Sequence, residues 1–399
     1  DEKMRKILDS LIQNEVMDIS ITGGEPLMYP DLVFGIIEIA LKAGIHCSIN
    51  SNLTIMTPKI ASKLSQLGVA VMTSILSHDS QTHDYIAQHK GAFNKLIRNI
   101  KVLQEFEVPV STNMVVMQDN YNHVYLTGKF VNSLGIKDFT ASKVNPAEGC
   151  THFNNKMLSP ESVKQSLEDL LSLTTEFGMQ VGNQTCYPAC FIGDLERYRE
   201  LNLRGCGAGS FHCTIGANGE VRACADTSNS YGNILTEPLP EIWAKMFKWR
   251  DGSYIPKQCK ECEYLPICSG GCRTDAKFHG GDFDALDPYA LKGNPKVLMM
   301  KTKEPPEIKP DEKLMVPKLQ FRKESFGVVV AVSGSAYNTP IVTDDSASIL
   351  SKLQEQEFTL PEICQKFNLQ MDEAKTFFAH LVQQGLAYQA KHNTQVERS

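Results

Sequence analysis

The stretch Ile21–Pro30, ITGGEPLMYP, places two glycines, an acid and a proline directly after a short apolar run. Gly23 and Gly24 allow the backbone to approach a ligand closely. Backbone carbonyls and the Glu25 carboxylate are suited to hold an ammonium group, and Pro26 stiffens the exit of the loop. A tight turn with a capping acid is an equally good interpretation of these residues by themselves.

Around this loop, short apolar stretches alternate with amphipathic helical patterns from about residue 17 to residue 181. Repeated strand–helix units predict an α/β fold, a partial (βα)6 TIM-like barrel with a parallel sheet and helices outside it. Such barrels carry functional groups on the loops after the carboxyl ends of the strands, where GGEP lies. The five strands visible in the sequence are DISIT (18–22), IHCSINS (45–51), VAVMTSI (69–75), VPVSTNMVV (108–116) and KDFTASKVN (137–145).

Composition excludes several classes of function. The chain has 399 residues and a net charge of −6, which provides no broad basic surface for nucleic acid. No apolar run approaches the ~20 residues of a membrane span, and no secretory signal opens the sequence. We therefore predict a cytoplasmic protein that binds neither nucleic acid nor membrane.

Twelve cysteines are present, and most fall within residues 186–272. The segment CKECEYLPICSGGC (259–272) contains a CxxCxxxxxCxxxC pattern, and CGAGSFHCTIGANGEVRAC (206–224) precedes it. In a large chain without a secretory signal, metal binding is favoured over disulfides. Thiolates suit both iron–sulfur clusters and zinc, so the spacing alone leaves zinc knuckles as an alternative.

The GGEP loop closely resembles the second-strand motif of the radical S-adenosylmethionine (SAM) superfamily, which holds the amino group of the SAM methionine. The segment INSNLT is similar to the third-strand TNG segment of that family, with Leu53 in place of its glycine. Isolated polar residues at such positions are more often caps or turn residues. By resemblance, the SAM-binding residues are Gly23, Gly24, Glu25, Pro26, Asn52, Ser74 and Asn113.

The cysteine pattern resembles the SPASM extension, which carries two auxiliary 4Fe–4S clusters. The resemblance assigns Cys206, Cys213, Cys224 and Cys272 to the first cluster and Cys259, Cys262 and Cys268 to the second. The related motif often ends in DPYC, whereas this chain has Ala290 at that position. We therefore expect that the second cluster has an open iron, that another residue replaces the missing ligand, or that this cluster does not form.

Other cysteines receive weaker assignments. Cys186 and Cys190, in TCYPAC, are possible substitute ligands. We favour the alternative that both are small buried residues with a structural role. Cys47 and Cys364 follow strand and helix patterns and are expected in the core, and Cys150 is unassigned. Asp226, two residues after Cys224, is interpreted as structural.

The CxxxCxxC loop that defines the superfamily does not occur in these 399 residues. In the family, it holds the cluster that reduces SAM to methionine and a 5′-deoxyadenosyl radical. We therefore expect this chain alone to be inactive. The opening helical pattern without an initiator methionine favours a fragment lacking a first strand over a degenerate homologue.

From about residue 314, two strand patterns and three helical patterns predict a small winged-helix-like α+β domain. Its apolar layout resembles the PQQ-biosynthesis peptide chaperone, or RiPP recognition element, which binds a leader peptide as an added strand. A DNA-binding winged helix is the alternative, but basic residues are sparse in the last helix. The predicted domains are 1–185 (partial barrel), 186–292 (SPASM), a linker at 293–313, and 314–399.

Together these resemblances predict a peptide-modifying radical SAM maturase that abstracts hydrogen from a ribosomally made precursor peptide. The predicted partners are that peptide and a reductant such as flavodoxin or ferredoxin. A sulfatase-maturing type of enzyme and a catalytically dead peptide-binding scaffold are the alternatives.

Overall fold

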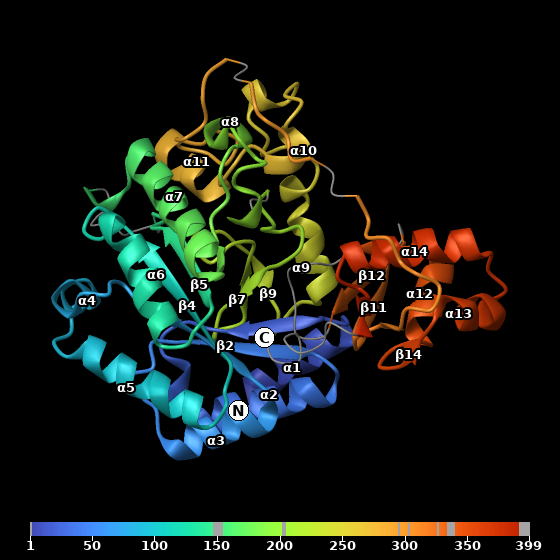
Figure 1. Ribbon diagram of the computed structural model, residues 1–399. Helices are drawn as coiled ribbons and strands as arrows, with labels where there is room; N and C mark the ends of the chain where they lie inside the picture. Colours follow the sequence, from blue (N-terminus) through green and yellow to red (C-terminus); the bar gives the residue numbers. More distant parts are fainter. Residues whose placement is uncertain are drawn as a thin grey trace. The chain divides into compact units, whose positions relative to one another are not determined.

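The computed structural model describes residues 2–146, 155–201, 205–293, 296–301, 304–324, 327–332 and 340–390. The chain forms two compact units: the larger comprises residues 1–14, 21–36 and 48–301, and the smaller comprises residues 302–399 together with 15–20 and 37–47. Figure 1 shows both, with labels on the α-helices and on some of the strands.

The N-terminal part of the chain builds a six-stranded sheet with the strands in sequence order, β1 to β6. The four pairings from β2 to β6 are parallel. A parallel sheet in sequence order requires a crossover between each pair of strands, and the intervening helices provide it. The strands are β1 Asp18–Ile21, β2 His46–Ser51, β3 Ala70–Ser74, β4 Val110–Val116, β5 Asp138–Lys143 and β6 Gln180–Gly182.

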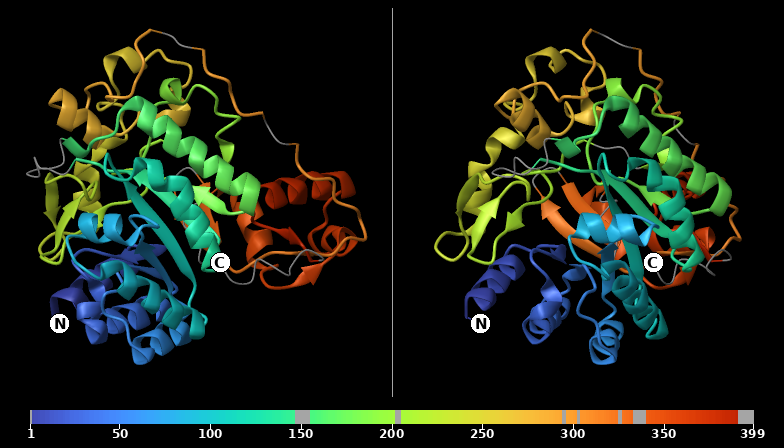
Figure 2. Two further views of the ribbon diagram at one scale, coloured as in Figure 1. Left: turned by 60° about the vertical axis from the view of Figure 1, so that its left-hand side comes forward. Right: turned by 90° about the vertical axis from the view of Figure 1, so that its left-hand side faces the viewer.

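Helices of this segment, coloured blue to green, lie on the outer side of the curved sheet (Figure 2). Their ends follow the sequence signals: Thr57 caps α3 and Ser159 caps α7, while Gly68 and Gly178 end these helices in the left-handed conformation. The helices are α1 Glu2–Gln13, α2 Pro30–Lys42, α3 Pro58–Leu67, α4 Ser80–Ala87, α5 Ala92–Glu105, α6 Val124–Ser133 and α7 Pro160–Phe177, with short 3₁₀ turns η1 Pro26–Met28 and η2 Tyr121–His123.

The predicted α/β fold with a parallel sheet is confirmed, and all five predicted strands are present. Two elements were missed. The strand β6 has only three residues, too few for a periodic pattern, although it follows the helix-ending Gly178. The helix α4 lies within a polar stretch, SQTHDYIA, whose only buried residue is His83.

The cysteine-rich segment of the larger unit has little regular structure, as its composition predicts. A small antiparallel sheet, β7-β8-β9, and several single-turn helices account for most of it. The elements are α8 Ala189–Ile192, η4 Arg199–Leu201, β7 Thr214–Ile215, β8 Glu220–Arg222, β9 Ser230–Asn233, α9 Leu239–Lys245, η5 Phe247–Trp249, η6 Lys257–Cys259, α10 Leu265–Cys268 and α11 Arg273–Gly280.

The smaller unit contains two three-stranded sheets, β11-β12-β13 and β14-β10-β15, and three helices that agree with the predicted ones. Its core includes Leu314, Val330, Leu350, Leu360 and Phe378, all fully buried. Each such side chain contributes about 1.5–3 kcal/mol of hydrophobic stabilisation. The elements are β10 Leu314–Met315, β11 Leu319–Glu324, β12 Gly327–Val332, β13 Ile341–Val342, α12 Asp344–Ser351, β14 Glu357–Phe358, α13 Leu360–Phe367, α14 Met371–Gln383 and β15 Tyr388–Gln389.

Among the residues that the structure describes, no helix has the length and apolar character needed to cross a membrane.

Candidate cofactor-binding site

The loop after β1 exposes its backbone at Gly23 and Gly24. Gly23 and Gly24 have φ values of +86° and +54°, in the left-handed region that favours glycine. Both residues are exposed, and a Cβ atom at either position would meet no other atom within 4 Å. Backbone conformation, rather than lack of room, therefore selects glycine here, and the loop presents its peptide groups to open space.

The Glu25 side chain joins this loop to the end of β2. Its Oε1 atom accepts hydrogen bonds from the Leu27 amide at 3.0 Å and the Ser51 hydroxyl at 2.7 Å, and Oε2 accepts from the Asn52 amide at 2.8 Å. The carboxylate thus caps the short helix η1, as the turn interpretation predicts. A carboxylate has about four acceptor positions, so about one remains for a further donor.

Four residues form a row across β3 to β6, at the last residues of β3 and β6 and in the middle of β4 and β5. Strand register pairs Ser74 with Asn113, Asn113 with Thr140, and Thr140 with Gly182. The residue before Asn52 is paired with the residue before Ser74, so Asn52 stands level with this row at the end of β2. The strand register therefore aligns the predicted residues Asn52, Ser74 and Asn113 in one row, and Asn52 hydrogen-bonds to Glu25.

This row belongs to the face of the sheet that the helices leave uncovered. Along β2, β3 and most of β4, buried residues alternate with half-buried or exposed ones. The buried set faces the helices, as the two-residue period of a strand requires. The uncovered positions, six of them polar, are His46, Ser48, Asn50, Ala70, Met72, Ser74, Ser111, Asn113 and Val115. The sheet thus offers a polar concave surface beside the glycine–acid loop.

Two of the predicted amides already have local partners. The Oδ1 atom of Asn52 accepts hydrogen bonds from the Thr54 amide at 2.9 Å and the Thr54 hydroxyl at 2.6 Å. The Oδ1 atom of Asn113 accepts from the hydroxyls of Thr140 at 2.8 Å and Ser142 at 3.1 Å. Both oxygens hold neighbouring backbone or side chains in place, which orients each Nδ2 group for other acceptors.

Leu53, which replaces the glycine of the related motif, keeps the backbone conformation of a glycine. Its φ is +54°, and its side chain is fully buried. A left-handed non-glycine residue costs about 1–3 kcal/mol, and a buried leucine contributes about 1.5–3 kcal/mol. Burial of the side chain therefore offsets the backbone strain.

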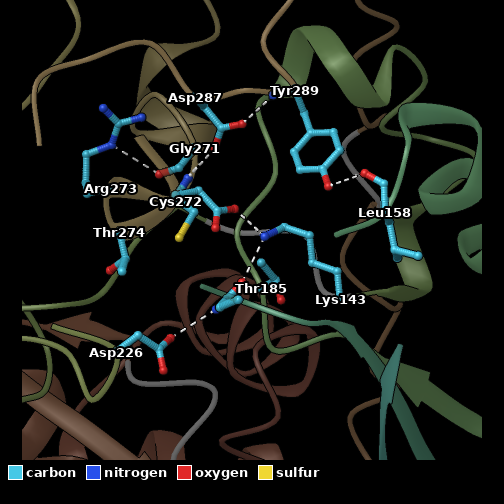
Figure 3. A network of polar contacts seen from close by, with 12 residues as sticks. Lys143, Leu158, Thr185, Asp226, Gly271, Cys272, Arg273, Thr274, Asp287 and Tyr289 are labelled. Atoms are coloured by element: carbon cyan, nitrogen blue, oxygen red, sulfur yellow. Dashed lines mark hydrogen bonds and ion pairs between the residues drawn. The ribbon is translucent and has the colours of Figure 1, made fainter. Parts of the chain in front are cut away.

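A buried ion pair connects the end of β5 to the cysteine-rich segment (Figure 3). Lys143 pairs with Asp275 of α11, and their side chains are 1% and 0% exposed. Lys143 Nζ also donates to Asn145 Oδ1 at 2.8 Å, and Asn145 Nδ2 donates to Asp226 at 3.0 Å. Burial alone would lower the pKa of Lys143, but attraction by Asp275, with a smaller contribution from Cys272, raises it, so the lysine stays charged.

The DPYA segment is fixed beside the same network. Asp287 accepts hydrogen bonds from the Cys272 amide at 2.8 Å and the Tyr289 amide at 2.9 Å (Figure 3). The Tyr289 hydroxyl donates to the Leu158 carbonyl at 2.9 Å. These bonds determine where Ala290, the next residue, lies relative to the cysteines.

The cysteines of this region fall into two groups. In the first cysteine group, a hydrogen bond with Cys186 is the largest influence that lowers the pKa of Cys206. Burial and then the neighbouring Asp226 and Cys206 raise the pKa of Cys224, and burial, Asp275 and Cys206 raise that of Cys272. The first cysteine group is Cys186, Cys206, Cys224 and Cys272.

The second cysteine group lines a cavity of about 390 Å³. Burial raises the pKa of Cys259 to about 11, and the nearby Cys268, Cys190 and Cys262 contribute in the same direction. The Arg273 guanidinium lowers the pKa of Cys259 and also that of Cys206. One buried cation therefore lies near both cysteine groups. The second cysteine group is Cys190, Cys259, Cys262 and Cys268.

The structure changes our interpretation of Cys186 and Cys190. Cys186 and Cys190, which we interpreted as small buried residues, each lie with three cysteines of the SPASM-like pattern and are half-buried. Burial alone raises the pKa of Cys213 to about 11, with no contribution from another thiol. The spacing CxxxC in TCYPAC was the signal for both missed residues.

The eleven cysteines that the structure describes form no disulfide, and Cys150 lies outside the described residues. In the same part of the chain, no three His, Cys, Asp or Glu side chains are close enough to hold a single metal ion. Cys47 is buried in β2 and Cys364 half-buried in α13, as expected for core positions. Asp226 hydrogen-bonds to Asn145, in keeping with its structural interpretation.

Comparison with known proteins identifies both regions. Residues 1–131 match the radical SAM superfamily, and residues 206–269 match SPASM, an iron–sulfur cluster-binding domain. The chain thus contains one region that matches a radical SAM domain and a second that matches a SPASM domain. The two domains imply SAM and iron–sulfur clusters as cofactors, as the sequence predicts.

The curated relatives of these domains are enzymes. The chain is 29% identical over 288 residues to an AdoMet-dependent heme synthase of Methanosarcina barkeri, which covers 68% of this chain and 81% of that protein. It is 24% identical over 288 residues to a PqqA peptide cyclase of Ruegeria pomeroyi, covering 69% and 75%. The prediction of a radical SAM superfamily enzyme is therefore confirmed.

The fold of much of the chain also matches a solved structure. Native anSMEcpe with bound AdoMet and Kp18Cys peptide superposes with a TM-score of 0.56 and 20% identity, covering 74% of this chain and 84% of that one. The six-stranded sheet is thus the partial barrel that the sequence predicts. The predicted peptide-recognition domain at residues 314–399 remains a prediction.

Proposed function

We propose that this protein acts in the modification of a ribosomally made precursor peptide, with SAM bound at the glycine–acid loop and the leader peptide bound by the smaller unit. The observation that supports a peptide substrate is the three-stranded sheet β11-β12-β13 of that unit. In its order β11-β12-β13, the described residues of the outer strands pair only with β12, and we propose the outer edge of β13 as the position of an added strand.

The residues of the radical SAM domain fit the proposed cofactor. The open backbone at Gly23 and Gly24 and the remaining acceptor position of Glu25 suit an ammonium group. The polar face that carries Ser74 and Asn113 suits a ribose. When bound and reduced by one electron, SAM supplies a radical that abstracts hydrogen.

The edge strand β13 carries an apolar side chain in position to meet a peptide. Ile341 is 57% exposed and lies opposite Val329 of β12. Added strands gain main-chain hydrogen bonds for affinity and side-chain contacts for specificity. The alternative of DNA binding is disfavoured because α14 begins with Asp372 and Glu373, which would repel phosphates.

A peptide selection tests the proposed leader-binding surface. A display library of random 30-residue peptides is selected on the full chain, and the enriched peptides are measured by fluorescence anisotropy. We expect Ile341→Lys to weaken binding at least tenfold. The matched control is Leu126→Lys, which changes another exposed apolar residue on α6 and should leave binding unchanged. Enriched peptides that bind equally to Ile341→Lys would refute the proposal.

A second candidate is a tetrapyrrole substrate, because three of the curated relatives are AdoMet-dependent heme synthases at 26–29% identity. Titration of the full chain with hemin distinguishes the two. A saturable Soret shift that Asn113→Leu removes would favour the tetrapyrrole, since Asn113 lies on the polar face of the sheet. A peptide substrate predicts no saturable shift.

A further inference from the structure

The backbone beside Ala290 contacts a sulfur atom that lies far away in sequence. The amide of Leu291, the residue after Ala290, donates a hydrogen bond to Cys190 Sγ at 3.4 Å, across 101 residues of sequence. Cys190 lies in the short helix α8, which packs against α10, the helix that ends at Cys268. Cys190 therefore places a thiol beside position 290, where the alanine side chain has none.

The cavity of the second cysteine group supports this placement. Its walls contain Cys190, Cys259, Cys262 and Cys268 together with Ala290. The alanine therefore faces the same space as the four thiols but has no ligand atom. Cys190 is half-buried, and its side chain forms part of the cavity wall.

We propose that Cys190 is the fourth thiolate ligand of an iron–sulfur cluster held by Cys259, Cys262 and Cys268, and that it replaces the ligand missing at Ala290. The proposal rests on the SPASM domain and is independent of the substrate. On ligation, each thiol gives up its proton to solvent and its sulfur binds one iron.

Two consequences follow from the geometry. Four thiolates complete the coordination of the cluster, which leaves no open iron for a substrate and fits a role in electron transfer. The Leu291 amide then hydrogen-bonds to a ligand sulfur, a contact that raises the reduction potential of a cluster by stabilising its more negative state. Because the donor is a backbone amide, the contact is kept when the side chain of Leu291 changes.

The test counts iron and sulfide in the anaerobically reconstituted full chain, with electron paramagnetic resonance (EPR) spectra after reduction and after mild oxidation. We expect Cys190→Ala to lower iron from about eight to about four per chain, or to yield a 3Fe–4S signal on oxidation that the parent lacks. The control is Cys364→Ala in α13 of the smaller unit, which should match the parent.

A rescue variant separates ligation from folding. Cys190→Ala/Ala290→Cys moves the thiol back to position 290 of the same cavity, so iron content and spectra should return to those of the parent. Circular dichroism verifies that each variant is folded. Unchanged iron, sulfide and spectra in Cys190→Ala would overturn the proposal, as would a loss that Ala290→Cys does not restore.

Discussion

The open face of the sheet and the cysteine-rich segment hold their functional groups in different ways. On the sheet, Ser74 and Asn113 stand side by side because the backbone ladder of β3 and β4 sets their register. In the cysteine-rich segment, side chains determine the positions, through Lys143 with Asp275 and the bonds of Asp287. Removing one side chain from the sheet leaves its neighbours in place, whereas removing one from the buried network leaves an unsatisfied partner.

The largest effect is expected where the two regions meet. Lys143→Met leaves the Asp275 carboxylate charged, buried and unpaired, so the free energy of unfolding should fall by about 3–5 kcal/mol. Urea unfolding followed by circular dichroism measures this change. The control Lys245→Met breaks a pair with Glu237 whose side chains are 49% and 33% exposed, and it should cost less than about 1 kcal/mol.

A double variant tests the cause of that loss. Lys143→Met/Asp275→Leu removes both charges and should recover most of the stability, because an apolar pair leaves no buried charge without a partner. If the double variant is as unstable as the single one, the charges do not dominate this contact, and the contrast between the two regions is wrong.

A smaller effect, confined to the cysteine-rich segment, compares two candidate ligands of the first cluster. The family resemblance assigns Cys213, whereas the structure places Cys186 in hydrogen-bond contact with Cys206. We expect Cys186→Ala to remove up to about four irons per reconstituted chain and Cys213→Ala to remove fewer than about one. Iron and sulfide assays on the two variants measure the difference. The reverse order would restore the family assignment.

Much of the sheet could be predicted from sequence because its information is local. Each strand has its own apolar pattern, and Gly23 to Pro26 are contiguous. The sixth strand was missed because three residues carry no period. The pairing of Lys143 with Asp275 spans 132 residues, and the contact of Cys190 with Leu291 spans 101. Spacing within one segment cannot show which distant segment lies beside a site, so the sequence could name Cys186 and Cys190 as possible substitutes but not which cysteines each of them accompanies.

The smallest effect is expected on the sheet, at Glu25. Glu25→Gln keeps an oxygen for the Leu27 amide and the Ser51 hydroxyl, but its NH2 group cannot accept from the Asn52 amide, and the charge that attracts an ammonium group is lost. A charge-assisted hydrogen bond contributes about 1.5–3 kcal/mol, so SAM affinity should fall about ten- to a hundredfold. Equilibrium dialysis with labelled SAM measures the affinity. Glu176→Gln, which alters an exposed carboxylate bonded to Tyr125 on the outer helices, should leave it unchanged. Equal SAM affinity in the parent and Glu25→Gln would show that Glu25 only caps η1. The polar face of the sheet would then be expected to bind a ligand other than SAM.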